Sequence, residues 1–447
     1  MSGEAAARWA VLGGGILGQV LALRLREAGH DVSLIEAAPD LGGLAAAWSV
    51  ADVTYDKFYH VILPFDRRTL ALLDELKLAH DIRWTRSSTG FFCDGQLVSL
   101  NGSADYLRLP VIGLIDKLRL ALLLVLGSRI EDGTPLDRVP VEDWLVRWCG
   151  RRCYDKLWLP LLNSKLGENH RLASAGFIWS TMRRLYLARK GSTKVEQLGT
   201  VQGGYKRILD AMKVRLVEAG VTIVTNTPVE AVTQTVDGLS VRVPSATWHF
   251  DRVVSTLPSG VTARLCNGLS EEDRARLNGV VYQGIISASV VLRRPLAGHY
   301  LTYLTDASLP FTAIVEMSAL TGTEGFGGKS LIYLPRYATQ DDTFWNLDDA
   351  QVEAAFLGGL RRVYPDLIDP DIAGFRCARV RHVMAVPTLG YRDRVPPVET
   401  SVPGLFVVNS SQILDGTLNV DATLGVLEAA LPALMASVHA LDRRLVA

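Results

Sequence analysis

Apolar and polar positions follow two different periods along the first 36 residues of the chain. Residues 8–12 form a short apolar run typical of a buried strand, and residues 19–28 carry apolar side chains at helical spacing. Gly29 ends this helix, and residues 31–36 form a second apolar run that closes on Glu36. The order predicts a strand–helix–strand unit, in which the two strands lie parallel in one sheet.

The same periods predict elements along the rest of the chain. Helices are expected at 66–76, 141–148, 151–162, 203–219 and 418–439. Strands are expected at 221–225, 241–243, 247–250, 252–258, 285–292, 300–304, 311–316, 331–337 and 404–409. Pro160 is expected to kink or end its helix, because proline lacks the N–H that a helix interior needs. This mixture of helices and strands predicts an α/β fold.

The most apolar long segment covers residues 106–126, but Arg108, Asp116, Lys117 and Arg119 interrupt it. Charges near the centre of a membrane span are costly, and the uninterrupted remainder is too short to cross a bilayer. We therefore expect no transmembrane helix. Three interpretations of the segment remain open: a buried helix, the wall of an apolar substrate channel, or a patch that lies on a membrane surface.

A glycine-rich turn joins the first strand to the first helix. Gly13, Gly15 and Gly18 fit the pattern G-x-G-x-x-G. Gly13 permits the tight turn, Gly15 allows the backbone to approach a pyrophosphate, and Gly18 allows close packing of helix on sheet. The N-terminal end of the helix offers unpaired N–H groups and a partial positive charge. We expect Ile16 and Leu17 to contact the same ligand as the glycines.

The acid that ends the second strand extends this pattern. Glu36 can accept hydrogen bonds from ribose hydroxyls and would repel a 2′-phosphate, so the unit predicts dinucleotide binding rather than an empty structural turn. A second glycine-rich loop then follows, where a nicotinamide dehydrogenase would continue into its next helix. Either this loop is an ordinary surface turn, or it contacts a cofactor longer than NAD. The second interpretation adds contacts from Ala37, Gly42, Gly43, Leu44 and Ala45.

With these motifs, residues 9–60 resemble the N-terminus of the FAD-dependent amine oxidase, protoporphyrinogen oxidase and phytoene desaturase superfamily, to which UDP-galactopyranose mutase is related. The sequence at 408–413 is similar to its protoporphyrinogen-oxidase-like bacterial branch of NAD(P)/FAD-dependent oxidoreductases. The resemblance implies non-covalently bound FAD in a Rossmann-like domain with a parallel sheet and helices. It also implies an interleaved α+β substrate domain, helical in its first part and sheet-forming in its second. The expected bounds are 1–75, 195–262 and 385–447 for the FAD-binding domain, and 76–194 and 263–384 for the substrate domain.

The resemblance also assigns FAD contacts far from the N-terminus. The backbone of Val229 is implied to pair with the adenine, although an ordinary strand residue is the alternative. Many relatives carry Gly-Asp where this chain has Asn409-Ser410, so either Asn409 or Asp415 would hold the ribityl chain; we favour Asn409. At the start of the last helix, the implied contacts to the flavin pyrimidine are Leu418, Asn419 and Val420.

Candidate catalytic residues lie in the segment 55–62, where bulky side chains replace two glycines that relatives often carry over the flavin. Tyr59 and His60 are therefore the expected flavin neighbours. His60 could exchange protons near neutral pH, or could make only a structural hydrogen bond. Lys57 could hold a water near flavin N5, or could form a salt bridge or face solvent.

Candidate substrate contacts are aromatic or polar side chains of the substrate domain. The helical part offers two tryptophans, and the strands offer polar or aromatic members that a sheet under a cavity would direct towards a ligand. Each of these residues is as readily explained by core packing. The candidates are Trp158, Trp179, Tyr303, Glu316, Arg336 and Tyr337.

Composition excludes several other classes of protein. The 447 residues are 48% hydrophobic and can bury a large core, and 47 basic and 47 acidic residues give no general attraction to nucleic acid. The five cysteines are scattered without a C-x-x-C, so neither a disulfide framework nor a zinc site is expected, and no other metal site is predicted. No signal peptide is recognised, and we expect a cytoplasmic protein, with peripheral membrane contact through 106–126 as an alternative.

The sequence therefore predicts an FAD-dependent oxidoreductase of the dehydrogenase, oxidase or desaturase type, acting in a biosynthetic pathway. It would move a hydride from a substrate C–H or C–N carbon to flavin N5, and its substrate would be a small, apolar or amphipathic molecule. The alternatives are a flavin-dependent sugar-nucleotide mutase, with arginines around a pyrophosphate, and a non-catalytic flavoprotein. The sequence indicates neither the electron acceptor nor the oligomeric state.

Overall fold

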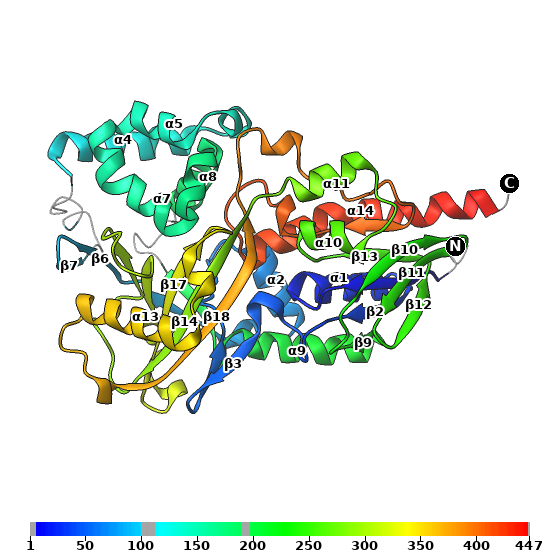
Figure 1. Cartoon of the computed structure of the whole chain (residues 1–447), viewed down its shortest axis with the longest axis horizontal. Helices are drawn as coiled ribbons and strands as arrows, with labels where there is room; N and C mark the ends of the chain where they lie inside the picture. The colour runs from blue at the N-terminus through cyan, green and yellow to red at the C-terminus, as the bar shows by residue number, and fades with distance from the viewer. Residues whose placement is uncertain (1–5, 100–104, 106–111, 189–196, 446–447) are drawn as a thin grey trace.

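The computed structural model describes residues 6–99, 105, 112–188 and 197–445. A parallel sheet with its helices forms one half of the molecule (Figure 1). A larger mixed sheet forms the other half, and a group of helices lies above that sheet in this view. The prediction of an α/β fold with a parallel sheet is confirmed.

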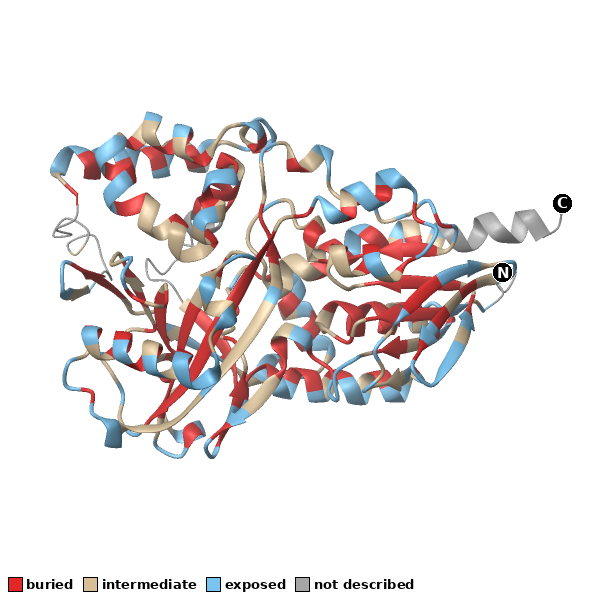
Figure 2. Cartoon of the chain, in the orientation of Figure 1, coloured by how far each residue is buried: buried red, intermediate tan, exposed pale blue. Residues whose placement is uncertain are grey.

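The parallel sheet draws its strands from three separate parts of the chain. Its order is β19 (Leu405–Val407), β13 (Arg252–Ser255), β1 (Arg8–Leu12), β2 (Asp31–Ile35) and β9 (Thr222–Val224), all parallel. Around it pack α1 (Ile16–Glu27), α2 (Arg67–Glu75), α9 (Gly204–Ala219) and α14 (Val420–Leu445). Trp9, Leu21 and Leu34 are fully buried between sheet and helices. In Figure 2 the central strands of this sheet are mostly buried, as expected for a parallel sheet covered by helices, whereas the edge strand β9 is not.

Smaller antiparallel units flank this sheet. The strands β10 (Ala231–Thr235), β11 (Gly238–Val243) and β12 (Ala246–Phe250) form a three-stranded meander, which includes the predicted hairpin. Two further pairs are β3 (Ala47–Val50) with β4 (Val53–Asp56), and β5 (Ile82–Arg86) with β8 (Gln197–Val201). Two short helices, α10 (Ser259–Leu265) and α11 (Glu271–Asn278), follow β13.

The mixed sheet carries the second half of the molecule. Its order is β18 (Ile372–Ala385), β14 (Tyr282–Leu292), β17 (Ser330–Ala338), β16 (Ala313–Glu316), β15 (Leu301–Leu304), β6 (Thr89–Cys93) and β7 (Gln96–Ser99). Helix α13 (Asp349–Val363) packs against the sheet, and α12 (Ser318–Thr321) follows β16. Every residue of β14 is buried, because other strands cover both of its edges and side chains cover both of its faces.

The remaining helices form a group with a core of its own. They are α4 (Leu114–Arg129), α5 (Val141–Cys149), α6 (Arg151–Cys153), α7 (Leu159–Leu166) and α8 (Ala175–Ala188). The predicted end of the helix at Pro160 is wrong, because the chain stays helical there: a π-helical turn over Tyr154–Trp158 leads directly into α7. Pro160 lies just after this turn, so the irregular hydrogen bonding of the π-helical turn accommodates a residue without an N–H inside a continuous helical run.

Burial in helix α4 accounts for only some of the apolar side chains in the segment 106–126. Its Leu120 and Leu123 are buried, as a buried helix requires, but Leu114, Ile115 and Leu118 are 65–68% exposed. Figure 2 shows both classes along this helix, and residues 106–111 lie outside the described part of the chain. Within the described residues, no helix is long and apolar enough to cross a membrane. Membrane contact through this segment stays a prediction.

Truncating a leucine to alanine should affect stability differently on the two faces of α4. We expect Leu123→Ala to lower the free energy of unfolding by about 2–5 kcal/mol, because it leaves a cavity in the helical core. Leu122→Ala, one residue away and 50% exposed, should change it by less than about 0.5 kcal/mol. Urea unfolding of both variants measures the difference. Equal losses would show that the outer face of α4 is covered in solution.

Candidate functional site

A cavity of about 380 Å³ lies where the parallel sheet meets the mixed sheet. The chain turns that follow β1, β2, β13 and β19 all contribute to its wall. Because the sheet is parallel, these turns lie together at the carboxyl ends of its strands, where open α/β sheets bind ligands. Predicted residues that line the cavity are Gly13, Gly15, Ile16, Leu17, Glu36, Gly42, Gly43, Leu44, Ala45, Tyr59, His60, Tyr337, Leu418, Asn419 and Val420.

The three motif glycines differ in their surroundings. Gly13 has a φ of 105°, which a turn of this kind demands of glycine. A Cβ at Gly18 would lie 1.9 Å from the carbonyl oxygen of Gly13, so Gly18 is a packing residue and does not line the cavity. A Cβ at Gly15 would meet no atom within 4 Å, because Gly15 faces open space. Gly15 also precedes α1, whose N-terminus has neither a side-chain cap nor an acid in its first turn.

Glu36 stands beside the glycine turn and is held by it. Its carboxylate accepts hydrogen bonds from the N–H of Gly14 at 2.6 Å and of Ala38 at 2.8 Å. Its carbonyl oxygen accepts a bond from Thr227 N–H at 2.9 Å. Glu36 therefore fixes the turn and still borders the cavity, where it can accept hydrogen bonds from a ligand.

The second glycine loop lies against the first. Gly42 N–H donates to the carbonyl oxygen of Gly14 at 2.8 Å, and a Cβ at Gly43 would lie 3.2 Å from the Cα of Gly15. Both residues have positive φ, 131° at Gly42 and 56° at Gly43. The two loops together form a backbone cradle that larger residues would fill, and this shape fits an extended phosphate-containing cofactor.

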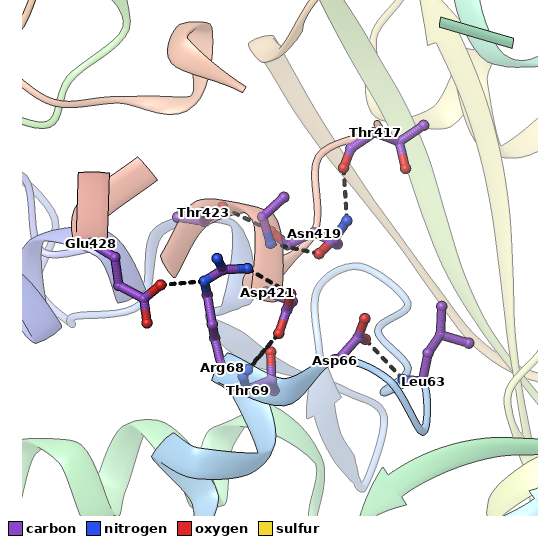
Figure 3. A network of polar contacts seen from close by, with 10 residues as sticks. Leu63, Asp66, Arg68, Thr69, Thr417, Asn419, Asp421, Thr423 and Glu428 are labelled. Atoms are coloured by element: carbon purple, nitrogen blue, oxygen red, sulfur yellow. Dashed lines mark hydrogen bonds and ion pairs between the residues drawn. The ribbon is translucent and has the colours of Figure 1, made fainter. Parts of the chain in front are cut away.

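The start of α14 is positioned by contacts with α2. Asp421 accepts hydrogen bonds from the backbone N–H groups of Arg68 at 2.8 Å and Thr69 at 3.2 Å (Figure 3). Asn419 caps α14, because its Oδ1 accepts a bond from Ala422 N–H at 2.9 Å. Leu418, Asn419 and Val420 border the cavity, and their contact with the flavin stays a prediction.

Asn409, which the sequence favoured for the ribityl chain, is turned away from the cavity. Its Nδ2 donates to the carbonyl oxygen of Leu257 at 2.8 Å, and its Oδ1 accepts a bond from Ser411 N–H at 2.9 Å. Ser410 borders the cavity in its place, and Asp415 pairs with Arg392 outside it. Asn409 therefore has a structural duty, fixing the loop that presents Ser410.

Three further predicted residues lie outside the cavity wall. Ala37 is exposed, and Val229 packs against the core beneath β10–β12. Lys57 is half-buried, and its backbone N–H donates to Ala46. Contact of these residues with FAD or with substrate stays a prediction.

His60 lines the cavity in a defined tautomer. Its Nδ1 lies 2.9 Å from the carbonyl oxygen of Phe58. A carbonyl oxygen can only accept, so Nδ1 carries the hydrogen and Nε2 keeps its lone pair. Burial lowers the pKa of His60 to about 4, although the bond to Phe58 opposes this shift. His60 is therefore a neutral imidazole at neutral pH and can accept a proton.

Asp56 is almost completely buried behind His60. Its Oδ1 accepts hydrogen bonds from the N–H groups of Tyr205 and Lys206 at the start of α9, and its Oδ2 has no hydrogen-bond partner among the described residues. Oδ2 lies 3.9 Å from Nδ1 of His60. Burial raises the pKa of Asp56 to about 7, and the two backbone bonds only partly oppose this.

This raised pKa makes one stability prediction. The folded protein holds the Asp56 proton to higher pH than the unfolded chain does, so this contribution to stability is lost as the pH rises through about 7. In Asp56→Asn this side chain can no longer ionise. We expect the melting temperature of the variant minus that of wild type to rise between about pH 5 and about pH 8. The exposed Asp40→Asn should show no such trend. A pH-independent difference for Asp56→Asn would refute the assignment.

The predicted substrate contacts separate into two groups. Tyr337 borders the cavity, whereas Trp158 and Tyr303 pack with the helical core. Trp179 donates from Nε1 to the carbonyl oxygen of Gly127 at 3.0 Å and borders a second cavity. The substrate roles of Trp158, Tyr303 and Trp179 stay predictions.

Glu316 and Arg336 are committed to structural bonds. The Glu316 carboxylate accepts bonds from the N–H groups of Leu296 at 2.9 Å and Gly298 at 3.1 Å, and so fixes the turn before β15. Arg336 pairs with Asp342 at 2.9 Å. Neither borders the cavity in the described structure, because their polar groups are directed to these partners.

Sequence reasoning missed one side of the cavity. The unpredicted wall residues are Phe58, Lys165, Thr256, Leu257, Pro258, Ile285, His382, Val383, Ser410 and Thr423. The strand that ends at Pro258 was a usable signal for three of them, because its carboxyl end joins the edge that holds the glycine turn. Lys165 offered no signal, because α7, β17 and the segment after β4 meet only in the tertiary structure.

Lys165, Tyr337 and Tyr59 form a connected cluster on that side, here named the lysine–tyrosine cluster. Lys165 Nζ donates to the Tyr337 hydroxyl at 2.8 Å and lies 4.5 Å from the centre of its ring. The hydroxyls of Tyr337 and Tyr59 are 2.9 Å apart. Burial raises the pKa of both phenols, so they remain neutral hydrogen-bonding groups.

This geometry agrees with the comparison with known families. The model of the flavin-containing amine oxidoreductase family matches residues 18–424. The chain belongs to this family. As a family member, it is an FAD-dependent oxidoreductase, and the predicted resemblance is confirmed. No curated protein matches the sequence.

Solved structures show the same fold at low sequence identity. A proposed protoporphyrinogen oxidase from Exiguobacterium sp. 255-15 has a TM-score of 0.77 and 15% identity, covering 97% of this chain and 100% of its own. Putrescine oxidase bound to putrescine has a TM-score of 0.71 and 16% identity, covering 96% and 99%. Reduced UDP-galactopyranose mutase has a TM-score of 0.69 and 16% identity, covering 98% and 94%. These likenesses establish the fold that this family member shares.

The cavity of this family member suits FAD. Gly15 leaves open space beside the uncapped end of α1, where phosphates can accept backbone hydrogen bonds. Glu36 is placed to accept from ribose hydroxyls, and the start of α14 and Ser410 border the opposite wall. The residues present therefore fit the cofactor that the family carries.

Proposed function

We propose that the protein oxidises a small organic molecule by removing a hydride from a C–H or C–N carbon. When bound, FAD supplies the hydride acceptor. The product has gained a C=C double bond or an imine. The observation that carries this proposal is the extent of the cavity. It runs from the glycine cradle to wall residues of β14, β17, β18 and α7, so both sheets and the helical group border it, and we assign the end away from the cradle to the substrate.

The chain itself would bind and orient the substrate and accept a proton from it. His60 has a lone pair on Nε2 at neutral pH and is the proposed acceptor for a substrate proton that leaves with the hydride. Apolar wall residues such as Ile285, Val383 and Leu418 would exclude water. Tyr59 and Tyr337 would orient polar groups of the substrate through their hydroxyls.

Anaerobic absorbance spectroscopy tests the proposal. The purified protein should show flavin bands, and these should bleach when a true substrate is added and return when an electron acceptor is admitted. Oxygen and a quinone analogue, added separately, would identify the acceptor. Acid precipitation should release the flavin, because we propose non-covalent binding. A protein that cannot be loaded with FAD, or that no organic reductant among the candidates reduces, would contradict the proposal.

A flavin-dependent sugar-nucleotide mutase is less well supported. Such an enzyme would bind the pyrophosphate of a sugar nucleotide, and arginine is the residue best suited to that task. No arginine is among the described residues that line the cavity. The mutase would gain support if dithionite-reduced protein converted sugar nucleotides without net oxidation. A non-catalytic flavoprotein would bind FAD and leave every candidate substrate unchanged.

A further inference from the structure

The lysine–tyrosine cluster has more hydrogen-bond donors than it can use internally. The ammonium of Lys165 carries three N–H groups and donates one to Tyr337. One phenolic O–H is used between Tyr337 and Tyr59, whichever of the two donates. Lys165 also interacts with the Tyr59 hydroxyl, so at least one ammonium N–H group and one phenolic O–H are left for a ligand. The cluster therefore suits a ligand that accepts hydrogen bonds.

The positive charge of Lys165 also has no counter-charge within the protein. Within the described chain, no carboxylate lies within ion-pair distance of its Nζ, although lysines at other sites pair with Asp52 and Asp210. Glu36 is the only acid among the described wall residues, and its carboxylate is bound to the glycine turn. A half-buried ammonium whose partners are all neutral keeps an uncompensated charge, and an anionic ligand would relieve this cost.

From this cluster we infer that the substrate carries a carboxylate, which Lys165 binds with the help of Tyr59 and Tyr337. One ammonium and one phenolic O–H match the charge and the acceptor geometry of a single carboxylate. A pyrophosphate would face one lysine and no arginine among the described wall residues, so it fits less well. A diamine such as the putrescine bound by putrescine oxidase would bring like charge against Lys165.

The inference rests on the proposed function and names the substrate class of the same site. Lys165 is a binding residue here, and His60 keeps the proton-transfer role. If the protein never binds FAD or is never reduced, the proposed function fails. If it binds FAD but shows no preference for carboxylates, only the present inference fails.

Titration of the FAD-loaded protein with small aromatic probes tests the inference. Benzoate, benzamide and benzylamine have similar shapes and differ in charge, and each is added while the flavin absorbance spectrum is followed. We expect benzoate to bind at least about tenfold more tightly than benzamide, and benzylamine to bind least well. Equal affinity of all three, or a preference for benzylamine, would overturn the inference without any variant being needed.

A lysine variant assigns the preference to the cluster. Lys165→Met should weaken benzoate binding at least about tenfold and leave benzamide nearly unchanged. Tyr337→Phe keeps the charge and removes one hydroxyl, so it should weaken benzoate binding by a smaller factor. The matched control is Lys156→Met, because Lys156 is exposed and lies outside the described cavity wall. A Lys165→Met protein with normal FAD content and unaltered benzoate affinity would refute the assignment.

Discussion

A Gly15→Val variant should fold normally and contain almost no FAD. A side chain at Gly15 meets no protein atom within 4 Å, and the backbone there, with a φ of −66°, suits any residue. The fold therefore has no reason to fail. The valine methyl groups would instead occupy the cradle between the two glycine loops and keep the pyrophosphate from the N–H groups of α1. Flavin absorbance per mole of protein and the melting temperature of the apoprotein measure the two effects.

Two other glycines provide controls for this experiment. Gly18→Ala should destabilise the protein itself, because its Cβ would lie 1.9 Å from the carbonyl oxygen of Gly13. Gly358→Val lies on the exposed side of α13, where a Cβ meets no atom within 4 Å, and should retain both fold and flavin. Retention of normal flavin content by Gly15→Val would show that the cofactor does not use this cradle.

His60→Ala should lower turnover by about 10²- to 10⁴-fold, the usual contribution of a positioned general base. Nε2 holds the free lone pair because Nδ1 is bound to Phe58, and the ring is neutral because burial lowers the pKa of His60 to about 4. The rate of anaerobic flavin reduction by a substrate is the measurement. Since the imidazole is neutral well above its pKa, its protonation should leave the wild-type rate unchanged between about pH 6 and about pH 8.

Added imidazole distinguishes catalysis from structure at this position. It should restore part of the rate to His60→Ala, because a free base can occupy the vacated space. His249→Ala, an exposed histidine on β12, is the control and should keep the wild-type rate. A His60→Ala protein with full flavin content and full activity would show that His60 makes only structural contacts.

Local geometry made the two glycine loops of the cavity predictable. Gly13, Gly15 and Gly18 belong to one turn. Glu36 accepts a hydrogen bond from Gly14 N–H in that turn, because it directly follows the strand next to β1. In these cases the backbone conformation of a few consecutive residues determines the result. The predicted elements at 8–12 and 31–36 correspond closely to β1 and β2 for the same reason.

The sequence is a weaker guide to the cavity wall where either of two adjacent polar residues could line it. Asn409 and Ser410 both follow β19 and both can hydrogen-bond to a ligand. Only Ser410 borders the cavity, because the loop at Leu257 engages the Asn409 side chain. Glu316, another predicted substrate contact, likewise has a partner that the sequence did not indicate, since a turn at Leu296 uses its carboxylate.

By itself, the sequence determined the α/β fold, the glycine cradle and the flavin-binding family, because these depend on periodicity and on short-range backbone conformation. The tertiary structure alone decided which side chains complete the cavity. Lys165 and Tyr337 are 172 residues apart, and their contact exists because α7 packs beside β17. No local pattern encodes such a contact, since it depends on how separate elements pack. The proposed substrate class rests on that packing.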